Sequence, residues 1–211
     1  MGVPVSSFDD FKTKLSMVRR KSMIFGFLLY DSRPSQQTIK NFTQKQAPWI
    51  DELARGAGIY FFFPFKKEGE NFRNPSPEIT RLFNLGVSRL PGIILFAPPA
   101  SHGKIISKHA VYIPLEEKDF DDDRVYEPLL SQLFDLIRDS IEISQNSHEV
   151  LVRIKDQLVR LRRKKNERAF ASYIRKGAHL VLFELPKAIL SSFSEALGKA
   201  LVEKVVPIPK V

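Results

Sequence analysis

The chain has 211 residues, no cysteine and a formal net charge of +9 at pH 7. The absence of cysteine excludes thiol catalysis, disulfide bonds and thiolate metal sites. An apolar fraction of 43% and a charged fraction of 27% are typical of a globular protein. No apolar run reaches the roughly 20 residues that a membrane-spanning helix needs.

The first part of the chain predicts alternating helices and strands. "SSFDDFKTKLSMVRRKS" has capping serines, first-turn acids and apolar residues at helical spacing, and "MIFGFLLY" (23–30) is a short apolar strand. A helix over residues 35–55 should be kinked at Pro48 and end at "GAG". "IYFFFPF" (59–65) predicts a second strand, whose aromatic run is typical of a sheet core covered on both faces.

The region that follows predicts a compact helix, a pair of strands and a long helix. In "NPSPEITRLFNLG" we expect Ser76 to cap the helix, Pro77 to occupy its first turn and Gly86 to end it. "GIILFAP" and "HAVYIPL" predict antiparallel strands, and the acidic run "KDFDDD" predicts the start of another helix. The predicted order up to about residue 143 is therefore α-β-α-β-α-β-β-α.

Two segments within this order resemble the thioredoxin-like superfamily. "FNLGVSRLPGIILF" (83–96) is similar to the family's helix end and third strand, where Pro91 takes the place of a proline with a cis peptide bond. "LLYDSRPSQQ", which runs into "QAPWIDELA", is similar to the family's first long strand and kinked helix. The resemblance places Ser32, Arg33, Pro34 and Ser35 where the family has Cys-Gly-Pro-Cys, and Asp31 in place of a tryptophan.

The resemblance implies an α/β fold with a mixed sheet and flanking helices over residues 1–143, followed by a basic helical extension over 144–211. It implies no redox activity, because serine hydroxyls cannot cycle through a disulfide. The family also buries an acid on the preceding strand, and that place is Gly26 here. We therefore expect no catalytic residue and no cofactor. No metal site is expected either, since the histidines lack further ligands at metal-binding spacing.

Ser32 leaves an enzymatic alternative open. In glutathione transferases a serine or tyrosine at this corner activates a thiol held by the ligand, and a helical domain follows. Those enzymes also carry an acid–serine pair soon after the proline strand, but residues 92–115 contain no acidic residue. The structural alternative for Ser32 and Ser35 is helix capping.

The positive charge is concentrated in residues 147–211, which hold 14 Lys and Arg against 6 Asp and Glu. Residues 147–176 predict an amphipathic helix with an apolar stripe and the basic residues Arg153, Lys155, Arg160, Arg162, Arg163, Lys164 and Lys165. Three interpretations remain open: packing on the domain or a second copy, attachment to an anionic membrane or partner, and binding of nucleic-acid phosphates. No base-reading motif supports the third.

The sequence thus predicts a non-catalytic, thioredoxin-like interaction module with a basic helical tail for oligomerisation or surface attachment. An extended segment of the partner would pair with the backbone beside Arg89, Leu90 and Pro91, bordered by residues 31–34, and the partner would be another protein or a second copy. The expected partner-binding residues are Asp31, Ser32, Arg33, Pro34, Ser35, Arg89, Leu90 and Pro91. The alternatives are a glutathione-transferase-like enzyme using Ser32 and a membrane-acting effector. We expect a cytoplasmic protein, with peripheral membrane attachment as an alternative.

Overall fold

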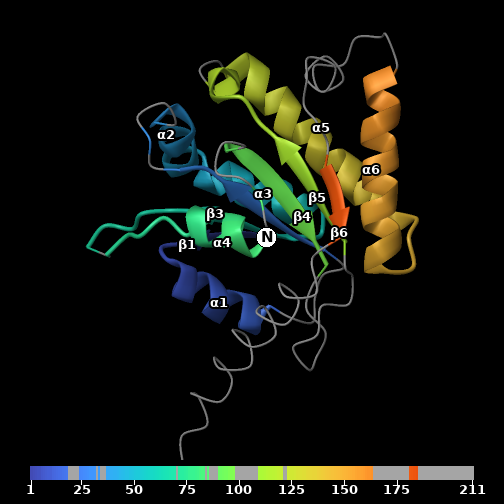
Figure 1. Cartoon of the computed structure of the whole chain (residues 1–211). Helices are drawn as coiled ribbons and strands as arrows, with labels where there is room; N and C mark the ends of the chain where they lie inside the picture. The colour runs from blue at the N-terminus through green and yellow to red at the C-terminus, as the bar shows by residue number, and fades with distance from the viewer. Residues whose placement is uncertain are drawn as a thin grey trace, which may run out of the picture.

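The fold was obtained as a computed structural model, shown in Figure 1. It describes residues 1–18, 24–31, 33, 37–69, 71–83, 85, 90–97, 109–120, 123–163 and 181–184. These residues form an α/β fold in which helices cover both faces of a six-stranded mixed sheet with the order β1-β3-β2-β4-β5-β6 (Figure 1).

The sheet has a parallel half and an antiparallel half. The mutually parallel strands are β1 (Gly2–Val5), β3 (Tyr60–Pro64) and β2 (Phe25–Leu29). Each following strand runs antiparallel to its neighbour, in the order β4 (Gly92–Phe96), β5 (His109–Pro114) and β6 (Val181–Glu184). The strands predicted within residues 23–30, 59–65, 92–98 and 109–115 are therefore confirmed as β2, β3, β4 and β5, in the shorter ranges given above.

The helices divide between the two faces of the sheet. One face is covered by α1 (Phe8–Met17) and α4 (Ser76–Leu82). The other is covered by α2 (Gln37–Lys45), α3 (Ala47–Gly56), α5 (Asp123–Glu142) and α6 (Ser147–Arg163), with the short 3-10 helix η3 (Glu117–Phe120) beside α2. The sheet therefore separates two hydrophobic cores, one on each of its faces.

Alternate residues of the central strands fill the two cores. Phe61 and Phe63 point into the α2–α3–α5–α6 core, whereas Phe62 points into the α1–α4 core. All three rings are at most 2% exposed, so the aromatic run of β3 is core, as predicted. This burial leaves none of these rings available to stack on nucleic-acid bases.

The strand β1 was not predicted, because four residues that include Pro4 give too short a pattern. It pairs in parallel with β3, and its register aligns Gly2 with Phe61. The N–H of Gly2 donates to Asp51 Oδ1 at 2.6 Å. A Cβ atom at Gly2 would lie 2.7 Å from the Cα of Asp51, so glycine lets α3 pass close to this strand.

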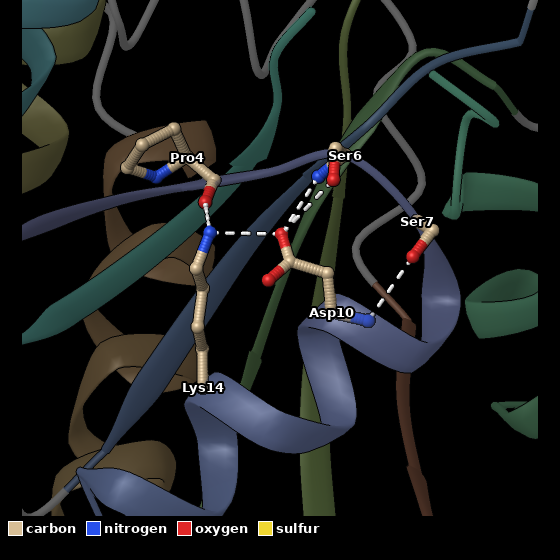
Figure 2. A network of polar contacts seen from close by, with 5 residues as sticks. All are labelled: Pro4, Ser6, Ser7, Asp10 and Lys14. Atoms are coloured by element: carbon tan, nitrogen blue, oxygen red, sulfur yellow. Dashed lines mark hydrogen bonds and ion pairs between the residues drawn. The ribbon is translucent and has the colours of Figure 1, made fainter. Parts of the chain in front are cut away.

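Side chains of α1 satisfy polar main-chain groups at the carboxyl end of β1 and just after it (Figure 2). Lys14 Nζ donates to the carbonyl oxygen of Pro4 at 2.6 Å and pairs with Asp10 Oδ2 at 2.8 Å. The same carboxylate oxygen accepts from the N–H of Ser6 at 2.9 Å. Ser7 caps α1 as expected, because its hydroxyl accepts from the Asp10 N–H at 3.1 Å.

The predicted kinked helix over residues 35–55 is wrong as a single element. The structure has two helices, α2 and α3, which meet at Gln46. Pro48 lies in the first turn of α3, where its missing N–H costs no helical hydrogen bond. The end of α3 is as predicted: Ala57 is its C-cap and Gly58 follows with a φ of 69°.

The C-terminal region is helical only in part. Residues 181–184 form β6 rather than a helix and pair with β5, so the expectation of an entirely helical extension is wrong there. α6 lies beside α5 (Figure 1). Apolar residues on one side of α6 are fully buried in the same core as the sheet: Val150, Leu151, Ile154 and Leu158. Of the three interpretations of the tail, packing on the domain is therefore the observed one for this stripe.

Candidate functional site

The predicted partner-binding residues belong to the carboxyl end of β2 and the chain that enters β4. Leu29 is the register partner of Gly92, so the residues after β2 continue beside those before β4. The Leu90–Pro91 peptide bond is cis, as the resemblance implied. After β2 the chain continues to α2 on one face of the sheet, whereas after β3 it continues to α4 on the other face. In α/β sheets, binding sites form at strand ends where neighbouring connections diverge in this way.

The main chain at the end of β2 is held by the start of α4. Asn74 Nδ2 donates to the carbonyl oxygen of Tyr30 at 2.8 Å, and the N–H of Tyr30 donates to Ser76 Oγ at 3.2 Å. The N-cap of α4 is Pro75, so the expectation that Ser76 caps this helix is wrong. The Ser76 hydroxyl instead accepts a hydrogen bond from the main chain just after β2. Local sequence patterns do not reveal this contact.

The Tyr30 side chain acts as a structural anchor. It is 1% exposed, and its hydroxyl donates to the carbonyl oxygen of Pro64 at 3.1 Å and lies 3.3 Å from Thr43 Oγ1. Burial raises the pKa of the Tyr30 phenol to about 12. The phenol is therefore protonated at neutral pH and links the ends of β2 and β3.

Asp31 and Arg33 form an ion pair where the chain leaves β2. Asp31 is only 7% exposed; its Oδ1 accepts from the N–H of Arg33 at 2.9 Å and its Oδ2 pairs with Arg33 Nε. The Arg33 side chain is 51% exposed. An aspartate that accepts from the N–H two residues ahead is a local turn signal, and "DSR" could have been read this way. The segment after β2 thus exposes a guanidinium that is paired with a buried carboxylate.

The main-chain carbonyl group of Pro91 is already hydrogen-bonded within the sheet. Its carbonyl oxygen accepts from the N–H of Leu115 at 2.9 Å and from the Tyr112 hydroxyl at 3.3 Å, and proline has no N–H to donate. Leu90 is 6% exposed and packs in the α1–α4 core. A partner segment would therefore have to meet the main chain before Pro91. Arg89, Ser32, Pro34 and Ser35 lie outside the described residues.

The position at which the family buries an acid is occupied by a neighbouring ring. A Cβ atom at Gly26 would lie 2.4 Å from Cδ2 of Phe61 and 3.2 Å from Cδ2 of Leu95. The Phe61 ring thus fills the space that a longer side chain on β2 would need. This chain carries neither the thiols nor the buried acid of the family's redox reaction.

The basic residues of α6 that the structure describes lie outside its buried stripe. Arg153 contacts Glu149 Oε1 through Nη2 at 2.7 Å and through Nε at 3.1 Å. The hydrogen bond that Glu149 accepts from the N–H of Gln145 lowers the pKa of the Glu149 carboxyl, and the hydrogen bond from Arg153 lowers it further. Lys155 is half-buried and Arg160 is exposed. The side chains of Arg162, Arg163, Lys164 and Lys165 are outside the described residues.

Two absences concern the part of the chain that the structure describes. Within it, no three His, Asp or Glu side chains gather closely enough to hold a metal ion. None of its helices combines the length and the apolar character that crossing a bilayer requires.

The sequence was also compared with known proteins. It matches no model of a protein family, and it matches no curated protein. The resemblance to thioredoxin-like proteins is therefore a hypothesis that depends on the motifs and geometry described above.

Proposed function

We propose that this chain is a non-catalytic, thioredoxin-like interaction module. The parallel β2–β3 pair, the antiparallel β4–β5 pair and the helices on both faces support this fold assignment. The absence of cysteine and the Phe61 ring beside Gly26 support the non-catalytic part. The function is then binding rather than disulfide exchange.

In this proposal an extended segment of a partner protein pairs with the main chain just before Pro91, beside residues 31–34. The observation that carries it is the register of Leu29 with Gly92, because this register sets the end of β2 beside the entry to β4. Main-chain hydrogen bonds would supply affinity, and side chains at the border would supply selectivity. The half-exposed Arg33 guanidinium is suited to donate hydrogen bonds to a carbonyl or carboxylate oxygen of the partner.

The test is selection of random displayed peptides against the full chain, followed by affinity measurements with variants. Arg33→Glu and Arg89→Glu should each weaken the selected peptides by about tenfold, because both reverse a charge at the proposed border. Arg55→Glu is the matched control, since Arg55 is 72% exposed on α3. Unchanged affinity in both border variants would contradict the proposal. Retention on immobilised glutathione with conjugation of a chromogenic electrophile would favour the transferase alternative instead.

The basic face of α6 is proposed as an attachment surface for an acidic partner or an anionic membrane. Support comes from the burial of the apolar stripe, which leaves Lys155 half-buried and Arg160 exposed on the other side of α6. Lys155→Glu with Arg160→Glu should reduce co-sedimentation with anionic liposomes, because each basic residue near the surface adds about 1 kcal/mol. Lys66→Glu with Lys67→Glu, in the exposed segment after β3, is the charge-matched control.

A further inference from the structure

A pocket of about 200 Å³ opens between α3 and α5, and no sequence pattern predicted it. Its apolar floor is formed by Trp49, Leu53 and Phe134. Its polar rim is formed by Glu52, Asp135 and Arg138. None of these residues belongs to the proposed partner-binding edge or to α6, so this α3–α5 pocket is a separate feature.

The volume of the α3–α5 pocket limits what it can hold. Sites for small molecules and cofactors usually occupy about 300–1,000 Å³. A pocket of about 200 Å³ is too small for such a ligand but large enough for one long side chain. A protein segment that inserts a single residue is therefore the fitting occupant.

The rim of the pocket favours a cation. Arg138 is already neutralised, since its Nη2 lies 2.9 Å from Asp135 Oδ1 and its Nε lies 3.7 Å from Asp139 Oδ1. Glu52 is exposed and has no ion pair or hydrogen bond with the other residues that the structure describes. The rim is thus negative, in a chain whose formal net charge is +9. An incoming cation gains a carboxylate partner there, whereas an anion meets repulsion.

The floor of the pocket supplies an aromatic surface beside those carboxylates. Trp49 is only partly buried. Its ring packs edge-on against Phe42 at 6.4 Å and against Tyr126 at 6.2 Å between centroids. These contacts hold the indole in place while it also lines the pocket. A planar guanidinium stacks well on an indole and pairs well with a carboxylate.

We propose that the α3–α5 pocket binds an arginine side chain presented by a partner protein. The guanidinium stacks on the Trp49 indole and pairs with Glu52, and the aliphatic stem lies over Leu53. Apolar neighbours of the arginine contact the partly buried side chains of Trp49 and Leu53, since Phe134 is only 3% exposed. This binding site is independent of the partner-binding edge beside Pro91, so each can fail without the other.

Trp49 is the single tryptophan of the chain, so its fluorescence reports directly on the pocket. The probes are three capped tripeptides, Leu-Arg-Leu, Leu-citrulline-Leu and Leu-Glu-Leu, titrated into the full chain. Citrulline has almost the shape of arginine but no charge. We expect a saturable change in emission with the arginine peptide, an affinity about five- to tenfold lower with citrulline, and no binding of the glutamate peptide.

Variants separate the carboxylate from general effects of charge. Glu52→Gln should weaken the arginine peptide by about five- to tenfold, whereas Glu68→Gln, in the exposed turn after β3, should leave it unchanged. Equal binding of the arginine and citrulline peptides would overturn the proposal in favour of a purely apolar pocket. Binding of the glutamate peptide would overturn it in favour of an anion site at Arg138. The absence of any saturable response would also overturn it.

Discussion

The ammonium group of Lys14 donates a hydrogen bond to the carbonyl oxygen of Pro4 at 2.6 Å and closes the outer edge of β1 (Figure 2). Pro4 has no N–H, and the N–H groups of Gly2 and Ser6 are held by Asp51 and Asp10. A strand added at this edge would therefore meet polar groups that are already hydrogen-bonded. Unprotected edge strands promote aggregation in β-proteins. We infer that extended partners do not bind at β1.

Lys14→Met should lower the free energy of unfolding by about 1–2 kcal/mol, because it leaves a part-buried carbonyl and the Asp10 carboxylate without their cation. Chemical denaturation measures the loss. Lys12→Met is the matched control on the same helix, since Lys12 pairs with Asp9, whose side chain is 86% exposed, and lies over the Phe8 ring at 5.2 Å from its centroid without holding a main-chain carbonyl. That control should change stability by less than about 0.5 kcal/mol. Equal effects of the two substitutions would contradict the role of Lys14.

Gly92→Ala should destabilise the fold by about 1–3 kcal/mol through overpacking. Tyr112 is the register partner of Ile94 and lies on the same face as Gly92, where a Cβ atom would meet its ring and hydroxyl at 2.2–2.5 Å. The double variant Gly92→Ala with Tyr112→Leu should cost less than the sum of the single changes. A double-mutant cycle by thermal denaturation measures this coupling. Strict additivity would show that the ring does not set the requirement for glycine.

Tyr30 should make stability fall as the pH rises from 10 to 12. The phenol has an ordinary pKa of 10.0 when unfolded and about 12 when folded, so above pH 10 the unfolded chain loses the proton first. The loss reaches about 2 kcal/mol at pH 12 and is absent below pH 9. Urea denaturation across this range measures the slope, and Tyr30→Phe should make it shallower. An unchanged slope in that variant would assign the alkaline loss to other groups.

Cysteine cross-linking tests the proposed neighbourhood of residues 32 and 89. The natural chain has no cysteine, so a Ser32→Cys, Arg89→Cys variant contains a single possible intramolecular disulfide. We expect it to form on mild oxidation, because the Leu29–Gly92 register brings both segments together. The control pair Ser32→Cys, Met17→Cys should stay reduced, since Met17 ends α1, which comes before β2, whereas residue 32 follows the carboxyl end of β2. Failure of the first pair to oxidise would refute the proposed site.

The sequence was most informative where a local pattern determines a local structure. Apolar runs located β2 to β5, and capping residues located α1. The break at Gln46 was missed because Pro48 fits either a kinked helix or the first turn of a new one. β6 was missed because "VLFE" lies in a long apolar segment, and only its pairing with β5 makes it a strand.

The candidate sites were predictable only in part, for a related reason. The main-chain position of Pro91 followed from a motif, whereas the roles of Asn74 and Ser76 depend on their approach to Tyr30 from a distant helix. The α3–α5 pocket joins Trp49 to Phe134 and Arg138, which are far apart in sequence. Contacts between residues so separated are set by packing of whole helices, and no periodicity reports them.

Ile154 tests whether α6 stabilises the same folding unit as the sheet. The sequence divides the chain at residue 143, but Ile154 is fully buried in one core with Ile137 of α5 and Val111 of β5. Ile154→Ala should therefore cost about 2–4 kcal/mol and lower the midpoint of a single transition. Val152→Ala, at a half-buried position of the same helix, should cost much less. If α6 were an independent appendage, Ile154→Ala would leave the main transition unchanged and alter only a separate one, as calorimetry of the full chain would show.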